Sequence, residues 1–195
     1  MPSREQRREH YDRYVAAVRT LCRTPAHRKT LANGRGRDLD DCPDLTRLLI
    51  KPSHGFGARR AHYTVAALIA LEPATPYPSH SPDRAETDPT GPDEPRPTWR
   101  QRPTLGHTFA RAARTHRLAA GGLERELGVL TRLSAPTLHP RLPHTARRLL
   151  DLGARPDWAV LLDDLALWDY HPHTVARRWR EAFYLDLPTD LLQEN

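Results

Sequence analysis

A proline-rich stretch at residues 72–103 most constrains how this chain can fold. It holds nine of the 19 prolines in the 195-residue sequence. Proline removes a backbone donor and interrupts helices, and the Ser, Thr, Asp and Gly residues between these prolines offer little apolar surface to bury. We therefore expect a linker or a long surface excursion that forms no helix and adds little to a core.

Helical periodicity dominates on both sides of this stretch, and the alternation typical of strands is nearly absent. Ser3 and Gln6 have capping-box spacing ahead of an apolar stripe. Pro25 and Gly34 frame a second, short helix. Asp157 is a suitable N-cap for a helix rich in leucine and tryptophan.

These patterns predict an all-α fold, a two-lobed helical bundle with a proline-rich linker between the lobes. We place the N-terminal helical lobe at 1–71, the acidic proline-rich linker at 72–103 and the C-terminal helical lobe at 104–195. Trp158, Trp168 and Trp179 fall at core positions of their helices, so we interpret them as packing residues rather than as base-stacking residues.

Positive charge is concentrated in two blocks on either side of acidic sequence. The formal net charge is +6; residues 1–71 carry 14 basic and 7 acidic groups, and residues 96–132 carry 8 and 2. Residues 72–95 carry 1 basic and 6 acidic groups. Such blocks indicate either a polyanionic partner or an ordinary basic surface, and charge alone does not separate the two.

Several basic residues recur at spacings that suit a helix lying along phosphates, although a solvated helix face gives the same pattern. Arginines in the Asn-Gly-Arg-Gly-Arg loop are placed to reach a backbone phosphate or to stay in solvent. The candidate nucleic-acid-binding residues are Arg28, Lys29, Arg35, Arg37, Arg47, Lys51, Arg59, Arg60, Arg125, Arg132, Arg147 and Arg148.

No motif in the sequence indicates catalysis. The glycine loop lacks the Lys-Ser/Thr of a P-loop, and Asp169, His171 and His173 match no metal-binding pattern. Asp163 and Asp164 are adjacent on a helix, so they point about 100° apart and are expected to solvate that helix. We expect a protein that is not an enzyme and has no metal or other cofactor.

The longest apolar run, residues 65–71, spans seven residues, far short of the ~20 that cross a bilayer. The first residues are polar and charged, unlike a signal peptide. Two cysteines do not make a disulfide scaffold. These features lead us to expect a cytoplasmic protein that does not associate with a membrane.

The last third of the chain resembles the C-terminal signature of the CasB family, the small subunit of the type I-E CRISPR interference complex (Cascade). The resemblance lies in residues 156–159, in Trp168 and Trp179, and in Phe183-Tyr184. Residues 43–71 and 105–132 are also similar to that family. The resemblance covers most of 20–195 and fails over 72–103.

The resemblance implies a non-catalytic, two-lobed helical subunit that stabilises the R-loop, the target and displaced DNA strands, for antiviral defence. It implies as partners the backbone subunits and the large subunit of the complex, a second copy of the chain, the crRNA and the target DNA. Contacts would come from Arg28 or Lys29, Arg59 or Arg60, Arg132, and Arg147 or Arg148. The alternative is a stand-alone DNA-binding protein, sequence-nonspecific or regulatory, although no helix-turn-helix spacing stands out.

Overall fold

The computed structural model describes residues 2–37, 41–73 and 98–188. Within these ranges the chain forms nine α-helices, one short 3₁₀ helix and no strand, so the predicted all-α class is confirmed. The α-helices are α1 (Arg4–Cys22), α2 (Pro25–Asn33), α3 (Pro43–Ser53), α4 (Arg59–Ile69), α5 (Leu105–Thr115), α6 (Ala120–Leu130), α7 (Ala135–Asp151), α8 (Trp158–Trp168) and α9 (Pro172–Asp186), and the 3₁₀ helix η1 is Arg117–Ala119.

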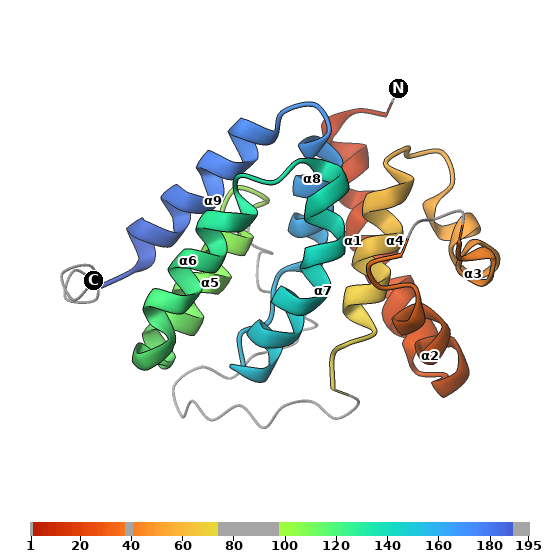
Figure 1. The fold of residues 1–195 in the computed structure, drawn as a ribbon. Helices are drawn as coiled ribbons and strands as arrows, with labels where there is room; N and C mark the ends of the chain where they lie inside the picture. Colours follow the sequence, from red (N-terminus) through yellow and green to blue (C-terminus); the bar gives the residue numbers. More distant parts are fainter. Residues whose placement is uncertain (1, 38–40, 74–97, 189–195) are drawn as a thin grey trace, which may run out of the picture.

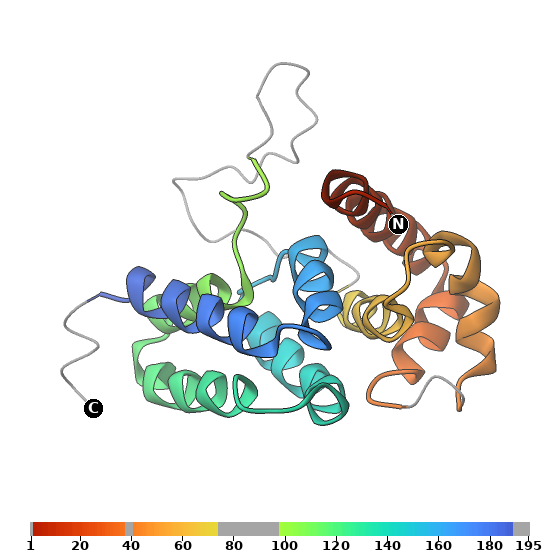
Figure 2. The same ribbon diagram turned by 90° about the horizontal axis from the view of Figure 1, so that it is seen from above.

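The helices are arranged along an elongated molecule. Helices α2 and α3 lie at one end, α5, α6 and α9 lie at the other, and α1, α4, α7 and α8 lie between them (Figures 1 and 2). Helix α8 packs against α1, α4 and α9, and α4 also packs against α7. The middle of the molecule is therefore built from both the N-terminal and the C-terminal parts of the chain.

The core is one continuous cluster of buried side chains that draws on every α-helix. Tyr11 and Leu68 from the N-terminal part belong to the same cluster as Phe109 and Phe183 from the C-terminal part. Three tryptophans, at positions 158, 168 and 179, are at most 1% exposed. Their predicted packing role agrees with this burial.

Local signals set several helix ends as predicted. Ser3 and Gln6 form a reciprocal capping box at the start of α1. The Asp157 carboxylate accepts hydrogen bonds from the backbone N–H groups of Ala159 and Val160, both at 3.1 Å. Gly106 allows α5 to approach α9 closely, because a Cβ there would overlap the carbonyl of Trp179.

Three prolines lie inside helices, where the sequence patterns did not place them. Proline at position 52 predicts the end of the third helix, but α3 continues through Pro52 to Ser53. Helix α7 contains Pro140 and Pro143 and begins at Ala135. A proline costs a helix one hydrogen bond, and burial of Leu138 and Leu142 on the same helix offsets that cost.

The proline-rich linker is described only at its ends, because residues 74–97 lie outside the described ranges. At one end, the Glu72 carboxylate accepts a 2.6 Å hydrogen bond from the Trp158 indole. At the other, Trp99 packs against the core, and the Arg102 guanidinium binds Asp157 and Asp12. The expectation that 72–103 contributes little to the core is therefore wrong for these ends.

Asp163 and Asp164 are buried at 3% and 0% exposure, so the prediction that they solvate α8 is wrong. The Asp164 carboxylate accepts a 2.6 Å hydrogen bond from the Trp179 indole and forms an ion pair with Arg178. Helix α8 is surrounded by α1, α4 and α9, which leaves it little solvent-facing surface. No helix in the described part of the chain is both long and apolar enough to cross a membrane.

Candidate nucleic-acid interface

Eight of the twelve candidate cations lie on α2, α3, α4 and their connections. The three helices pack against one another, so residues separated by up to 32 positions belong to one structural unit. Gly34 allows the loop after α2 to lie tightly on α3, because a Cβ there would overlap the side chain of Leu45. This packing fixes the loop that carries Arg35 and Arg37 beside α3.

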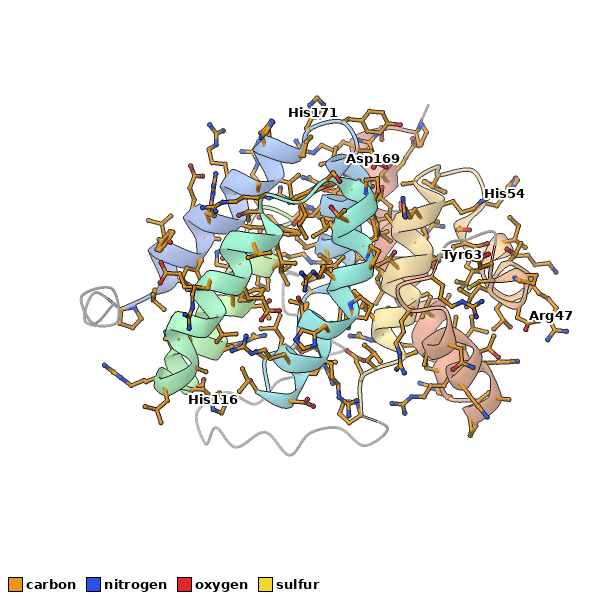
Figure 3. The ribbon with its side chains drawn as sticks, viewed as in Figure 1. Arg47, His54, Tyr63, His116, Asp169 and His171 are labelled. Carbon is orange, nitrogen blue, oxygen red and sulfur yellow. The ribbon has the colours of Figure 1, made fainter. Side chains whose placement is uncertain are left out.

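Six of these cations have exposed side chains that make no hydrogen bond or ion pair with any described residue. Figure 3 shows one of them, Arg47, directed outward from α3 at the edge of the molecule. A cation without an acidic partner in its own fold keeps its full charge for an external anion. The six are Lys29, Arg35, Arg37, Arg47, Lys51 and Arg59.

Arg28 has a different environment from its neighbour Lys29. Its Nε donates a 3.1 Å hydrogen bond to the carbonyl of Ala70, and its Nη2 donates to the carbonyl of Glu72. These carbonyls follow the last turn of α4, where a cation complements the helix dipole. Arg28 thus stabilises the fold at this helix end, and Lys29 is the member of the pair that faces solvent.

The four candidates in the C-terminal part are more engaged with their own fold. Arg125 Nε donates to the Gly121 carbonyl at 3.2 Å, and Arg147 Nε lies 3.3 Å from Asp151. Arg148 binds Glu126 at 2.6 Å, and the same carboxylate accepts a hydrogen bond from Thr145. Each of these three side chains therefore has part of its hydrogen-bonding capacity committed to its own fold.

Arg132 is the fourth of these candidates and does not share a helix with Arg125. Helix α6 ends at Leu130, and Arg132 lies in the turn before α7. The i, i+7 spacing of Arg125 and Arg132 predicts a common helix face, and this prediction is wrong because Arg132 lies beyond the end of α6. The Arg132 side chain is exposed and has no hydrogen-bond or ion-pair partner among the described residues.

Arg37 and Arg60 come together at a small pocket between the loop after α2, helix α4 and helix α7. Tyr63, Thr64 and His139 also line it. Figure 3 shows Tyr63 on the side of α4 toward α3. Burial, reinforced by the positive charge of Arg60, lowers the pKa of His139 to about 4. His139 and Tyr63 were not among the predicted residues, because their place at this pocket depends on the packing of α7 against α4.

Cys22 and the pair Asp169 and His171 are side chains of types that can act in catalysis or bind metals. Burial raises the pKa of Cys22, which disfavours the thiolate form that acts as a nucleophile. Asp169 and His171 are exposed at the end of α8 (Figure 3). Across the described ranges, no group of three or more His, Cys, Asp or Glu side chains is placed to hold a metal ion.

Comparison with known proteins identifies the family. The family model for CRISPR-associated protein Cse2 matches residues 27–184. A solved chain described as a CRISPR RNA-guided surveillance complex is 27% identical, with a TM-score of 0.74, and the match covers 97% of this chain and 99% of that chain. A second, described as a CRISPR RNA-guided surveillance complex, pre-nicking, is 28% identical, with a TM-score of 0.74 and coverage of 96% and 99%.

No curated protein matches the chain. The matched family residues run from α2 to α9 and include both parts of the shared core. The resemblance seen in the C-terminal tryptophan helices therefore extends over most of the fold. The chain belongs to the Cse2 (CasB) family, the small subunit of the type I-E Cascade surveillance complex.

Proposed function

We propose that this subunit binds the nucleic-acid backbone without catalysing a reaction and stabilises the R-loop, the target and displaced strands, inside the assembled complex. Its partners would be the backbone subunits, the large subunit, a second copy of itself, the crRNA and the target DNA. Binding would depend on charge rather than on sequence, because phosphate contacts position a strand but do not read its bases.

One observation carries this proposal. Six exposed cations on α2, α3, α4 and their connections have no acidic partner among the described residues. Most exposed ion pairs gain little stability, so the fold itself does not require partners for these cations. Six cations without a described partner on three packed helices do, however, give this part of the surface a positive potential that attracts a polyanion. A strand of phosphates would supply the missing negative charge.

The N-terminal cations are the first residues to test. Arg148 and Arg147 already bind carboxylates, so reversing their charge would disturb α6 and α7 as well as any external contact. Lys29, Arg47, Lys51 and Arg59 are exposed and make no such contact with a described residue. Reversing the charge of these four side chains should therefore change the electrostatic potential outside the protein without disturbing the core.

The experiment measures dissociation of target DNA from the reconstituted complex at fixed salt. The variant carries Lys29→Glu, Arg47→Glu, Lys51→Glu and Arg59→Glu together. Loss of four phosphate contacts should raise the dissociation rate at least about tenfold, with normal assembly. A control with the same charge change carries Arg13→Glu, Arg23→Glu, Arg100→Glu and Arg180→Glu, which are exposed and outside the candidate set.

Unchanged dissociation from a normally assembled complex would show that the four cations do not contact nucleic acid. Failure to assemble would assign them to a protein interface and would equally contradict the proposal. An equal effect of the control variant would mean that net charge, rather than this group of helices, governs retention of the DNA.

A further inference from the structure

Helix α2 ends in an Asn-Gly pair with an exposed asparagine. Asn33 is the last residue of α2, and its side-chain amide makes no hydrogen bond with a described residue. Asparagine is one of the thermolabile residues, because its side-chain amide can be lost as ammonia. The exposed amide of Asn33 is therefore accessible to water and open to chemical modification.

The residue after Asn33 determines how easily this amide reacts. The reaction requires the backbone nitrogen of the next residue to reach the side-chain carbonyl carbon, and Gly34 has no Cβ to obstruct that approach. Packing keeps glycine at this position, because a Cβ there would overlap the buried side chain of Leu45. A bulkier residue that would slow the reaction therefore cannot replace Gly34 without displacing a core side chain.

The hydrogen bond at the end of α2 opposes the reaction. The Gly34 N–H donates to the Leu31 carbonyl at 3.1 Å, and this bond has to open before the nitrogen can attack. It belongs to the last turn of a nine-residue helix, and such turns fray. The next bond, from the Arg35 N–H to the Ala32 carbonyl, is longer at 3.4 Å. We therefore expect the helix end to slow the reaction rather than to prevent it.

We propose that Asn33 is a site of spontaneous deamidation, which places a carboxylate among the exposed cations of α2, α3 and the loop between them. The Gly34 nitrogen, after losing its proton to hydroxide, attacks Cγ of Asn33. The bond from Cγ to the side-chain nitrogen breaks, and ammonia leaves. Water then opens the resulting cyclic imide, at Cγ to give aspartate or at the backbone carbonyl to give isoaspartate. In both cases an amide and water become a carboxylate and ammonium, with no oxidant or reductant.

Either product changes the charge beside Arg35 and Arg37, which are exposed on the same loop. A new negative charge lowers the local positive potential that attracts phosphates, and at the C-terminal end of α2 it also opposes the helix dipole. Isoaspartate in addition lengthens the backbone by one carbon where Gly34 is packed against Leu45. Deamidation should therefore weaken binding to the nucleic-acid backbone. This consequence rests on the proposed function, whereas the chemistry of Asn33 does not.

The first test follows the full chain during incubation at mildly alkaline pH. Peptide mapping by mass spectrometry should locate aspartate and isoaspartate at position 33, and it separates this site from the other asparagine in the sequence, Asn195. Asn33→Gln is the matched control, because the larger ring that glutamine would have to form closes far more slowly. The same chain unfolded in guanidinium chloride gives the rate without the helix end. No conversion of Asn33 in the folded chain, over a time in which the unfolded chain converts fully, would overturn the proposal.

The second test measures dissociation of target DNA from the reconstituted complex at fixed salt. Asn33→Asp carries the charge of the product and should raise the dissociation rate about two- to fivefold, the effect of losing one exposed ionic interaction. Asn33→Gln should match wild type. Asn33→Lys changes the charge in the opposite direction and suits the helix dipole, so it should slow dissociation. This variant separates an effect of charge from a loss of folding.

Equal dissociation rates for the aspartate, glutamine and lysine variants would overturn the effect of deamidation on binding. If the four-cation variant still releases target DNA faster in that case, the proposed function stands and only the present inference fails. If the four-cation variant also leaves dissociation unchanged, the proposed function fails as well. Conversion of Asn33 is measured by mass and does not depend on either result.

Discussion

At the scale of single residues, Arg102 joins two helices that are far apart in the sequence. Its Nε and Nη2 each donate 2.8 Å hydrogen bonds to Asp157, the N-cap of α8, and its Nη1 donates at 2.7 Å to Asp12 on α1. The guanidinium also lies 4.5 Å from the ring centroid of Trp99. A planar, bidentate arrangement of this kind requires arginine rather than lysine.

Replacing Arg102 with methionine should lower the free energy of unfolding by about 2 kcal/mol, because two charge-assisted contacts disappear and a helix cap loses its support. Urea denaturation followed by circular dichroism measures the change. Arg100→Met, two residues away and exposed, should differ from wild type by no more than about 0.5 kcal/mol. Equal stabilities of the two variants would contradict this role for Arg102.

The buried pair His10 and His62 is a second residue-scale feature with a measurable consequence. His62 Nδ1 lies 3.0 Å from the Ala58 carbonyl, which can only accept, so this nitrogen carries the proton. The neutral His62 Nε2 is then an acceptor, and His10 Nε2, 3.0 Å away, donates to it. Burial and the neighbouring His62 lower the pKa of His10 from 6.5 to about 4.

Because the folded protein takes up the His10 proton only near pH 4 and the unfolded chain takes it up near pH 6.5, acid favours unfolding between these values. The melting temperature should therefore fall as the pH drops from 6.5 to 4. In His10→Phe, which keeps an aromatic ring beside Phe56, this fall should be smaller; in His54→Phe, an exposed control, it should match wild type. Parallel pH profiles for all three proteins would disprove the assignment.

Some features of single residues in the candidate site could be predicted from the sequence, and others could not. Lys29, Arg47 and Lys51 are exposed as their sequence positions suggested, since a charged residue between apolar helix positions faces solvent. The role of Arg28 in holding the end of α4 could not be predicted, because the carbonyls that it binds lie 42 and 44 residues away in the sequence. The position of His139 could not be predicted for the same reason, because its partner Thr64 is 75 residues away in the sequence.

At the scale of helices, α8 differs from the other elements because it is buried on nearly every side. Its apolar positions and its Asp157 cap follow from the local sequence. The burial of Asp163 and Asp164 does not, since it depends on α1, α4 and α9 closing around the helix. Local periodicity predicts which residues share a face, but only the full packing shows how many faces are covered.

Asp164 connects α8 to α9 through the Trp179 indole and the Arg178 guanidinium. Asp164→Ala should reduce the free energy of unfolding by about 2–3 kcal/mol, because it leaves the buried indole N–H of Trp179 without its acceptor and removes the partner of the partly exposed Arg178. Asp169→Ala, at the exposed end of the same helix, is the control and should cost no more than about 0.5 kcal/mol. Chemical denaturation of both variants measures these changes. Similar losses of unfolding free energy in the two variants would refute the role given to Asp164.

At the scale of the whole molecule, the single buried cluster predicts how the chain unfolds. All four tryptophans lie between residues 99 and 179, whereas helices are spread over the whole chain. If α1 and α4 unfold together with α8, tryptophan fluorescence and far-ultraviolet circular dichroism should give coincident urea transitions. An earlier transition by circular dichroism alone would show that the N-terminal helices form an independent lobe.

The anchored ends of the proline-rich segment have a consequence for how this gene can change. Glu72 is held by Trp158 and Arg155, and Arg102 is held by Asp12 and Asp157, so contacts outside the interval between these two anchors fix the helices on both sides. None of these anchoring contacts comes from the sequence between the two anchors. We therefore expect insertions and deletions in that interval to disturb the described helices less than changes elsewhere, and we expect the same interval to accept an epitope tag or a reporter.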